Sequence, residues 1–311
     1  MSTLVAIVGP TASGKSDFAL DLADALGGPP SVEIIGADAM QLYRGMDVGT
    51  AKVPQGERRG IQHHQIDVID IHEDASVAAY QKHAREDAST IMGAGKTPVV
   101  VGGSGLYLRA LLDKMEFPGT DPKVRARLED ELVTEGAASL HARLESLDPK
   151  AAERIDPRNG RRTVRALEVI EITGKPFSAS LPEYLYHQPS VQIGISLPVE
   201  VLDQKIAPRT QRMFELGLVE EVQGLAKMGL ADTKTASRAT GYRQVLDMLD
   251  GEISEEDAKE AIALATRQLA RRQIKWFRRD PRITWVDPRD EDSLGRVLQT
   301  IRDPQNAEAF L

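Results

Sequence analysis

The sequence predicts an α/β protein with a parallel-sheet core that contains a phosphate-binding loop and is interrupted by an inserted all-helical subdomain. A phosphate-loop pattern lies near the start of the chain, strand-like and helical runs alternate up to residue 116, and only helical patterns follow up to residue 189. We therefore expect a first part of the core over 1–116, the helical subdomain over 117–189 and a second part of the core over 190–311.

The phosphate loop is the octapeptide GPTASGKS, which fits the pattern G-x-x-x-x-G-K-[ST] at every fixed position. An apolar run at 4–8 precedes it, as a buried strand would, and Phe18, Leu22 and Leu26 follow at helical spacing. Backbone N–H groups at the start of a helix bind phosphate oxygens. The expected phosphate-binding residues are Gly9, Pro10, Thr11, Ala12, Ser13, Gly14, Lys15 and Ser16. Lys15 would neutralise phosphate charge, and Ser16 would help to hold Mg²⁺.

Two further strand-like runs end in residues that could act on a bound ligand. The run 32–36 leads to Asp38, and the run 97–101 leads to a glycine-rich turn that contains Ser104. Because the carboxyl ends of parallel strands meet at one edge of a sheet, both residues are expected beside the phosphate loop. Asp38 could instead cap the segment that follows it, and the turn could serve only to reverse the chain.

Two other stretches predict structure rather than chemistry. The segment from His63 to Val68 is expected to form a strand with its two adjacent histidines on opposite faces. A histidine pair without further ligands at suitable spacing makes a poor zinc site. The chain after Asp287 is polar and is expected to be peripheral.

The composition excludes several functional classes. The chain has 311 residues, 41% hydrophobic and 28% charged, which is typical of a globular protein, and it has no cysteine for a disulfide or a thiolate metal site. Its net charge of −8 argues against a globally basic surface that would coat nucleic acid. No secretion signal and no apolar run of membrane-spanning length is visible, so we expect a cytoplasmic monomer that binds no membrane.

Two local clusters of basic residues contrast with this acidic balance. Between residues 267 and 282, on and after a long helix that begins at Ser254, seven basic residues stand against the single acid Asp280. The second cluster, in the helical subdomain, consists of Arg158, Arg161, Arg162 and Arg165. A charged helix face is usually only solvated. Two basic clusters that flank a phosphate site nevertheless favour a polyanionic partner.

The chain carries, in this order, the motifs GPTASGKS, ADAMQLYRGMDVGTAK, HHQID, VVVGGSGLYLRALL, DPRNGRRTVRALEV, ATGYRQ and TRQLARRQIKWFRR. Together they closely resemble the bacterial tRNA dimethylallyltransferase family, from about Thr3 to Trp285. Only the phosphate loop among them is shared widely with other families. Members of this family transfer the dimethylallyl group of dimethylallyl diphosphate to N6 of the adenosine immediately 3′ of the anticodon, position 37, and release diphosphate. They need Mg²⁺.

The resemblance implies a role for several residues. Asp38 matches the family's general base, Ser104 matches a position that contacts the acceptor near the reacting amine, and Arg209 matches an arginine that reaches the diphosphate. Lys15 would stabilise the departing diphosphate. The residues implied to contact the anticodon stem-loop of tRNA are Asp38, Ala39, Met40, Gln41, Ser104, Arg125, Arg161, Arg162, Thr163, Val164, Arg165, Arg238, Arg243, Arg271, Arg272 and Lys275.

Three other functions stay open at this point. An adenylate isopentenyltransferase would share the phosphate loop and Asp38, but it acts on a free nucleotide and would leave the basic helical subdomain without a ligand. A phosphate-loop ATPase or small-molecule kinase would turn over ATP without a prenyl donor. A non-catalytic RNA-binding protein with a regulatory nucleotide would not need Asp38.

Overall fold

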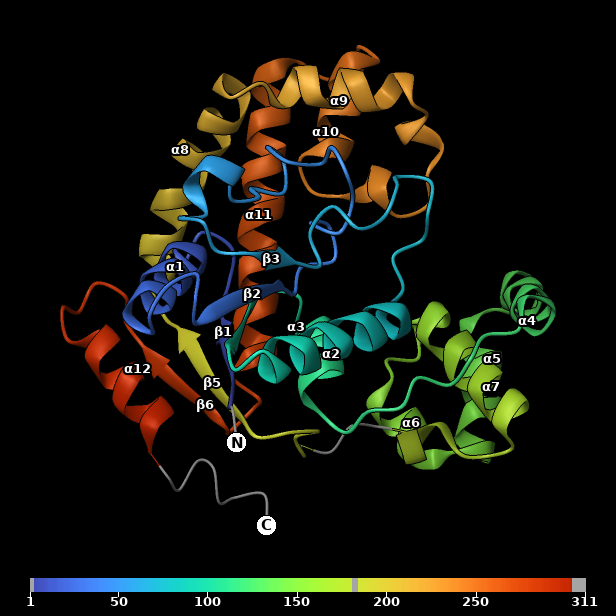
Figure 1. Cartoon of the computed structure of the whole chain (residues 1–311). Coiled ribbons are helices and arrows are strands. Elements are labelled where there is room, and N and C mark those ends of the chain that lie inside the picture. Colours follow the sequence, from blue (N-terminus) through green and yellow to red (C-terminus); the bar gives the residue numbers. More distant parts are fainter. Residues whose placement is uncertain (1–2, 181–183, 304–311) are drawn as a thin grey trace. The chain divides into compact units, whose positions relative to one another are not determined.

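A computed structural model describes residues 3–180 and 184–303 of the chain (Figure 1). The chain forms two compact units: a core unit made of Met1–Leu112 with Tyr186–Leu311, and a helical unit, Asp113–Leu185. The sequence predicts 117–189 for the helical subdomain. The helical unit begins and ends near residues 113 and 185 because the Lys114 N–H donates to the Leu185 carbonyl at 2.8 Å. This hydrogen bond pairs the segments that enter and leave the unit.

The core unit contains a six-stranded parallel sheet with the strand order β3-β2-β4-β1-β5-β6. Its strands are β1 Leu4–Val8, β2 Val32–Gly36, β3 His63–His64, β4 Thr97–Gly102, β5 Ser190–Ile195 and β6 Ile283–Val286. The central strands read as continuous apolar runs because helices cover both faces of the sheet. All six carboxyl ends therefore lie on one edge, which confirms the predicted parallel-sheet core.

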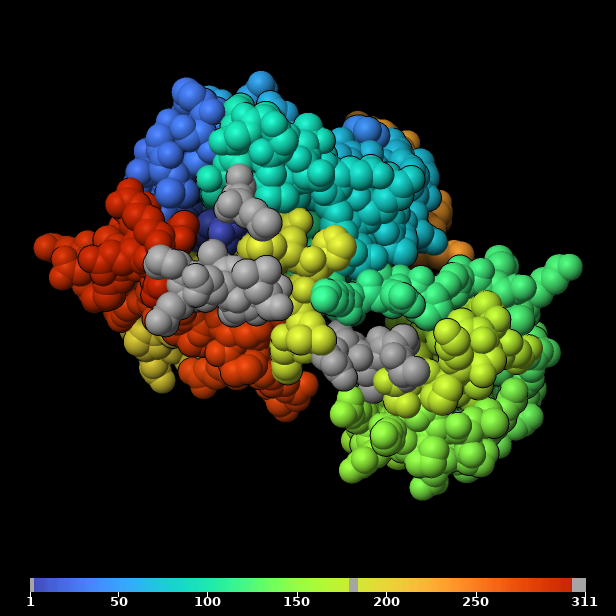
Figure 2. Space-filling model, turned by 60° about the horizontal axis from the view of Figure 1, so that its bottom comes forward, coloured from blue at the N-terminus to red at the C-terminus, as the bar shows by residue number. Residues whose placement is uncertain are grey.

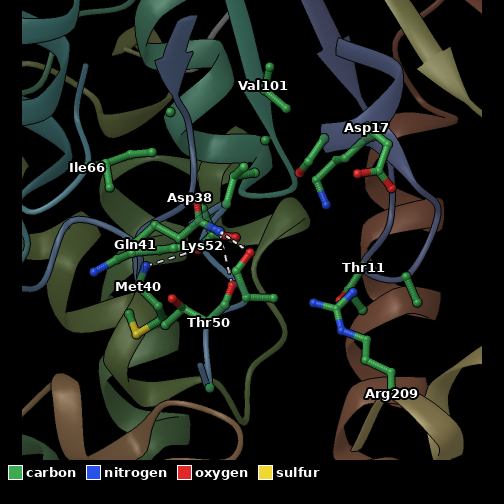
Figure 3. Close-up of a pocket in the computed structure, with 18 of the residues that line it drawn as sticks. Thr11, Asp17, Asp38, Met40, Gln41, Thr50, Lys52, Ile66, Val101 and Arg209 are labelled. Carbon is green, nitrogen blue, oxygen red and sulfur yellow. Dashed lines mark hydrogen bonds between the residues drawn. The ribbon is translucent and has the colours of Figure 1, made fainter. Parts of the chain in front are cut away.

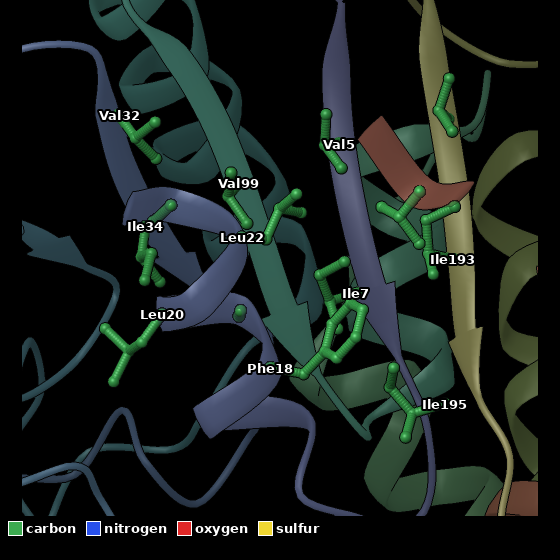
Figure 4. Packing of buried hydrophobic residues seen from close by; sticks show 14 of the residues in the cluster. Val5, Ile7, Phe18, Leu20, Leu22, Val32, Ile34, Val99, Ile193 and Ile195 are labelled. Atoms are coloured by element: carbon green, nitrogen blue, oxygen red, sulfur yellow. The ribbon is translucent and has the colours of Figure 1, made fainter. Parts of the chain in front are cut away.

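Helices of the core unit surround this sheet (Figure 1). They are α1 Lys15–Ala25, α2 Val77–Gly93, α3 Gly105–Leu112, α8 Val199–Glu215, α9 Leu218–Lys227, α10 Tyr242–Leu249, α11 Glu255–Phe277 and α12 Ser293–Arg302. Short 3₁₀ helices span Gln55–Glu57, Leu230–Asp232 and Ala236–Arg238. Figure 4 shows Phe18 and Leu22 of α1 packed toward Ile7 and Val99 of the sheet. This buried apolar contact fixes where α1, and with it the phosphate loop, meets the sheet.

The chain after Asp287, predicted to be peripheral, contains α12, which packs into the core unit next to the strand β6 that precedes it. Residues 304–311 lie outside the described residues. The strand β6 pairs with β5 in parallel, and α12 buries Val297 completely in the cluster that also holds α1. Figure 2 shows the surface of this C-terminal segment, in red, next to that of α1, in blue. The apolar residues of α12 recur at helical spacing and form one buried face, although the segment as a whole is polar.

The predicted strand from His63 to Val68 is shorter than expected. Only His63–His64 pairs with β2, and the next residues leave the extended conformation, with φ of 57° at Gln65 and 59° at Asp67. Residues with positive φ cannot continue a strand ladder. The chain beyond β3 is therefore an ordered loop on the carboxyl edge of the sheet.

The helical unit contains α4 Pro122–Glu135, α5 Ala137–Leu147, α6 Pro149–Arg154, α7 Gly160–Thr173 and a 3₁₀ helix, Phe177–Ser180. Asp121, Asp148 and Asn159 cap three of these helices through their side chains. The sequence analysis missed the short helix α6, which an Asp-Pro pair starts. The helices enclose a separate apolar core around Leu128, Leu144 and Leu167, so this unit has the anatomy of a small domain.

Candidate active site

The phosphate loop runs from the end of β1 to the start of α1, as the motif predicts. Gly14 has φ 82° at the N-terminal cap of α1, and Ala12 has φ 63°. These left-handed conformations curl the backbone around the helix terminus. Gly9 lies against β5, where a Cβ atom would be 3.1 Å from the Ile195 carbonyl oxygen. The Ser13 side chain is buried, and its hydroxyl has no hydrogen-bond partner in the described part of the chain.

The loop opens onto a cavity of about 700 Å³ within the core unit. Figure 3 shows Asp38 on one side of this cavity and Thr11 and Arg209 on the other. The volume suits a small-molecule ligand. The predicted site residues that line the cavity are Thr11, Ala12, Gly14, Lys15, Ser16, Asp38, Met40, Gln41 and Arg209. The predicted residues Gly9, Pro10, Ser13, Ala39 and Ser104 lie within two positions of a lining residue in the sequence but do not line the cavity themselves.

Two cations reach this cavity without an acidic partner. Within the described residues, the Lys15 ammonium donates its only hydrogen bond to the Pro10 carbonyl, at 3.4 Å, and Arg209 has no hydrogen bond or ion pair. Asp38 attracts both cations through space without pairing with either. Desolvation lowers the pKa of Lys15 to about 8, with Asp38 opposing the shift and Arg209 adding to it. Burial also lowers the pKa of Arg209. Two partly desolvated cations facing one space form a binding site for an anion.

Asp38 and Ser104 lie at the carboxyl ends of neighbouring strands, as predicted. The Met40 N–H donates to Asp38 Oδ1 at 3.0 Å, and the Ala39 N–H donates to Ser104 Oγ at 3.2 Å. No helix follows Asp38 directly in the described chain, so its side chain caps a turn rather than a helix. Its second carboxylate oxygen has no hydrogen-bond partner among the described residues and is available as a proton acceptor beside the cavity.

The chain between Gln41 and Lys52 forms one wall of the cavity. Lys52, whose side chain is 3% exposed, donates to the Tyr43 carbonyl at 2.6 Å and to Asp47 and Asp67 at 2.7 and 2.5 Å. The buried Lys52 ammonium thus connects three separate positions of this irregular loop. Gln41 completes the wall by donating from Nε2 to the Thr50 carbonyl at 3.0 Å.

Glu221, in the first turn of α9, supports the same wall from the side away from the cavity. Its carboxylate accepts the backbone N–H groups of Asp47, Val48 and Gly49 at 3.0, 2.7 and 3.2 Å. It also accepts the Tyr242 hydroxyl at 2.5 Å. Burial first, and then this carboxylate, raise the pKa of Tyr242. Glu221 has no distinctive signal in the sequence, because an acid in the first turn of a helix is already explained by the helix dipole.

Gln273 of α11, whose role no sequence pattern indicates, contacts the phosphate loop directly. The Thr11 backbone N–H donates to Gln273 Oε1 at 2.8 Å. Thr11 was expected to offer this N–H to a diphosphate, but the structure gives it to a side chain. The Thr11 N–H is therefore not free for an anion, which leaves the backbone N–H groups toward Gly14 and the start of α1 as candidates for this role.

Among residues 3–180 and 184–303, no cluster of three or more histidine or acidic side chains is arranged to hold a metal ion. The histidines of β3 have other partners: His64 Nε2 lies 2.6 Å from Glu33, and His63 Nδ1 lies 2.9 Å from the Ile61 carbonyl.

Among residues 3–180 and 184–303, none of the helices has the length and hydropathy needed to span a bilayer.

The sequence model of the family described as IPP transferase matches residues 41–280, which is more than half of the chain. The chain belongs to the IPP transferase family. A tRNA dimethylallyltransferase of Thermobifida fusca is 58% identical over 303 residues, 97% of this chain and 95% of the relative.

Two solved structures are similar over most of the chain. One is the full-length tRNA isopentenylpyrophosphate transferase of Bacillus halodurans, with a TM-score of 0.71 and 37% identity, and with coverage of 100% of this chain and 98% of that one. The other is a eukaryotic dimethylallyltransferase acting on tRNA, with a TM-score of 0.81 and 26% identity, and with coverage of 96% and 78%. These similarities confirm the predicted fold class and family.

In this member of the IPP transferase family, several residues expected to contact RNA have internal roles in the helical unit. Glu168, 0% exposed at its side chain, pairs with Arg125 and with Arg165, the latter at 2.7 Å. Thr163 and Val164 are buried. Arg161 and Arg162 remain exposed and have no acidic partner within the described residues.

The cations of the core unit predicted to contact RNA also fall into ion-paired and unpaired groups. Arg271 pairs with Asp203 at 2.7 Å, and Arg243 pairs with Asp247 at 2.8 Å. Among the cations predicted to contact RNA, Arg238, Arg272 and Lys275 are exposed and have no acidic partner within the described residues. Although Leu264 stands at an apolar position of α11, its side chain is 53% exposed and does not dock the helix. The inner face of α11 consists instead of Ile262, Ala270, Gln273 and Phe277.

Proposed function

We propose that this protein transfers the dimethylallyl group of dimethylallyl diphosphate to N6 of the adenosine at position 37 of tRNAs, with release of diphosphate. The observation that carries the proposal is that Lys15 and Arg209, both without an acidic partner in the described chain, share one cavity with the carboxylate of Asp38. An anion site beside a proton acceptor suits the transfer of an allylic group from a diphosphate to an amine. The names of the relatives, tRNA dimethylallyltransferase and dimethylallyltransferase acting on tRNA, support the choice of substrates.

The donor diphosphate binds at the start of α1. Its oxygens accept backbone N–H groups from the loop near Gly14, the Lys15 ammonium and the forked guanidinium of Arg209. These groups stabilise the charge that develops as the allylic C–O bond breaks and its electron pair passes to the diphosphate. Because the allylic cation is delocalised, stabilising the leaving group and positioning the acceptor are the main tasks of the site.

The donor site also fits Mg²⁺. Ser16 lines the cavity next to Lys15, and a site of this kind binds Mg²⁺ through one hydroxyl, the substrate's phosphate oxygens and water, without the acidic cluster that the described residues lack. When bound, the ion would neutralise part of the charge on the leaving diphosphate.

The acceptor adenine enters on the side of Asp38. As the C–N bond forms, the free carboxylate oxygen of Asp38 takes the proton from N6, whose lone pair is otherwise conjugated into the ring. The Ser104 hydroxyl accepts the Ala39 N–H and can donate its own proton toward the acceptor. A base must leave its stack to reach this depth, which an unpaired anticodon loop permits.

The phosphate backbone of the anticodon stem-loop contacts the exposed cations of both units. Arg161 and Arg162 serve this role in the helical unit, and Arg238, Arg272 and Lys275 serve it in the core unit. Arg125 and Arg165 act by supporting α7, and Thr163 and Val164 can offer RNA only their backbone. We propose that a single chain carries all of these contacts and works in the cytoplasm.

Mass spectrometry of nucleosides tests the proposed function. Unmodified tRNA is incubated with the protein, Mg²⁺ and dimethylallyl diphosphate, with AMP and with ATP alone in parallel tubes. We expect a dimethylallyl adduct on adenosine 37 alone. An adduct on AMP and none on tRNA would show an adenylate isopentenyltransferase, and phosphate release from ATP without any adduct would show a nucleotide hydrolase.

A further inference from the structure

One side chain joins the phosphate loop to the turn that carries Ser104. Gln273 lies on the inner face of α11 and is 9% exposed. Its Oε1 accepts the Thr11 N–H at 2.8 Å, and its Nε2 donates to the Gly103 carbonyl at 3.0 Å. The two contacts span 262 and 170 residues of sequence. Both ends of one amide are therefore committed to backbone groups of two different loops.

The surroundings of Gln273 leave little room for other side chains or loop positions. A Cβ atom at Gly103 would lie 2.4 Å from Gln273 Nε2, and one at Gly102 would lie 2.1 Å from the Ala37 carbonyl oxygen. The 102–104 turn thus packs against both α11 and the residue that precedes Asp38. The glutamine amide supplies both a donor and an acceptor, whereas a glutamate of the same length lacks the N–H and a methionine offers only a weakly accepting sulfur.

We propose that Gln273 is a positioning residue that holds the phosphate loop and the 102–104 turn in fixed register. The proposal rests on the proposed function, in which the phosphate loop binds the donor and the turn lies beside the acceptor amine. Gln273 contacts neither substrate; it sets the distance between them through Thr11 and Gly103. A displacement of about 1 Å between reacting groups is enough to cost on the order of a hundredfold in rate.

The substitutions that test this role keep the volume of the side chain. Gln273→Met removes both hydrogen bonds, and Gln273→Glu keeps an acceptor for Thr11 but loses the donor to Gly103. Gln268→Met is the matched control, because Gln268 lies exposed on the same helix and no contact of its side chain with the loop exists in the described structure. Melting temperatures of all variants establish that they are folded.

Binding of inorganic diphosphate, measured by calorimetry, reports on the phosphate loop without any transfer reaction. We expect Gln273→Met to weaken binding by about tenfold, because an unpaired Thr11 N–H leaves the loop without its anchor. We expect Gln268→Met to bind as the wild type does. Wild-type affinity in Gln273→Met would overturn the proposal.

Steady-state kinetics with tRNA reports on the register between the two loops. We expect kcat for both Gln273 variants to fall by about 10- to 100-fold while KM for tRNA stays unchanged. Released diphosphate should exceed prenylated tRNA, because water that replaces the amine yields dimethylallyl alcohol, diphosphate and a proton. A higher KM for tRNA with an unchanged kcat would assign Gln273 to RNA binding and overturn the proposal. If the wild type forms no product on tRNA, the proposed function fails, and the diphosphate titration still decides whether Gln273 anchors the loop.

Discussion

Burial lowers the pKa of Lys15, and the guanidinium of Arg209 adds to this shift, although Lys15 belongs to the phosphate loop and Arg209 to α8. Neither cation has an acidic partner in the described chain, and both are partly desolvated. Their mutual repulsion is relieved when an anion with more than one negative charge enters the cavity. The electrostatics of the site therefore favour an anion with more than one negative charge, as the proposed diphosphate donor has.

The pH dependence of donor use should report on Lys15. With a pKa of about 8 in the free protein, Lys15 loses its charge as the pH rises through that value. We expect kcat/KM for dimethylallyl diphosphate to fall by roughly tenfold for each pH unit above the inflection. Lys15→Arg keeps the charge and should lack this inflection. The same alkaline inflection in both proteins would contradict the assignment.

The lowered pKa also predicts that Lys15 costs stability. The folded pKa of about 8 lies below the ordinary value of 10.5, so the penalty is full below pH 8 and is relieved as the pH rises toward 10.5. We expect Lys15→Met to raise the melting temperature at neutral pH and to lose most of this gain near pH 10.5. Calorimetry at both pH values measures the difference, and a gain that grows with pH would show the opposite sign.

Arg209→Met should weaken donor use far more than the same change at a neighbouring surface position. We expect kcat/KM for the donor to fall by about 10²–10³-fold, because one forked donor to the leaving diphosphate is lost. Arg212→Met is the control, since Arg212 is exposed on the same helix α8. Equal effects of the two substitutions, measured with the same tRNA, would remove Arg209 from the site.

Asp38→Asn keeps an acceptor for the Met40 N–H but removes the proton acceptor. We expect kcat to fall by about 10²–10⁴-fold, with little change in the dissociation constant for tRNA. Single-turnover kinetics and filter binding measure the two quantities separately. Wild-type turnover in the Asp38→Asn variant would mean that another group takes the proton from N6.

The arginines of the helical unit should separate into two functional groups. Charge reversal at Arg161 and Arg162 should raise KM for tRNA and reduce the salt slope of binding by about one for each lost phosphate contact, without a change in melting temperature. Arg125→Ala should instead lower stability by about 1.5–3 kcal/mol, because it removes one of the two guanidinium partners of the buried Glu168 and leaves Arg165 as the other. A salt slope that responds to Arg125 and not to Arg161 would reverse this division.

Local patterns identified much of the fold and part of the site. The strand-loop-helix context of the phosphate loop and the carboxyl-end positions of Asp38 and Ser104 follow from apolar runs and turn residues that are close in sequence. Two short elements have no recognisable pattern in the sequence. The helix α6 has six residues, and the strand β6 has four, two of them exposed, so neither pattern repeats often enough to be recognised.

Residue order and spacing were enough to establish the parallel-sheet core, the phosphate loop and the family, because each depends on patterns that can be read directly along the chain. Only the folded structure shows which polar groups have no hydrogen-bond or ion-pair partner within the protein. Charge can be read from a sequence, but pairing cannot: Arg165 is committed to Glu168 while Arg161 stays exposed, and Thr11 gives its N–H to Gln273 from the far end of the chain. A buried polar group must find a partner wherever the fold brings one, and that distance is set in space rather than along the chain.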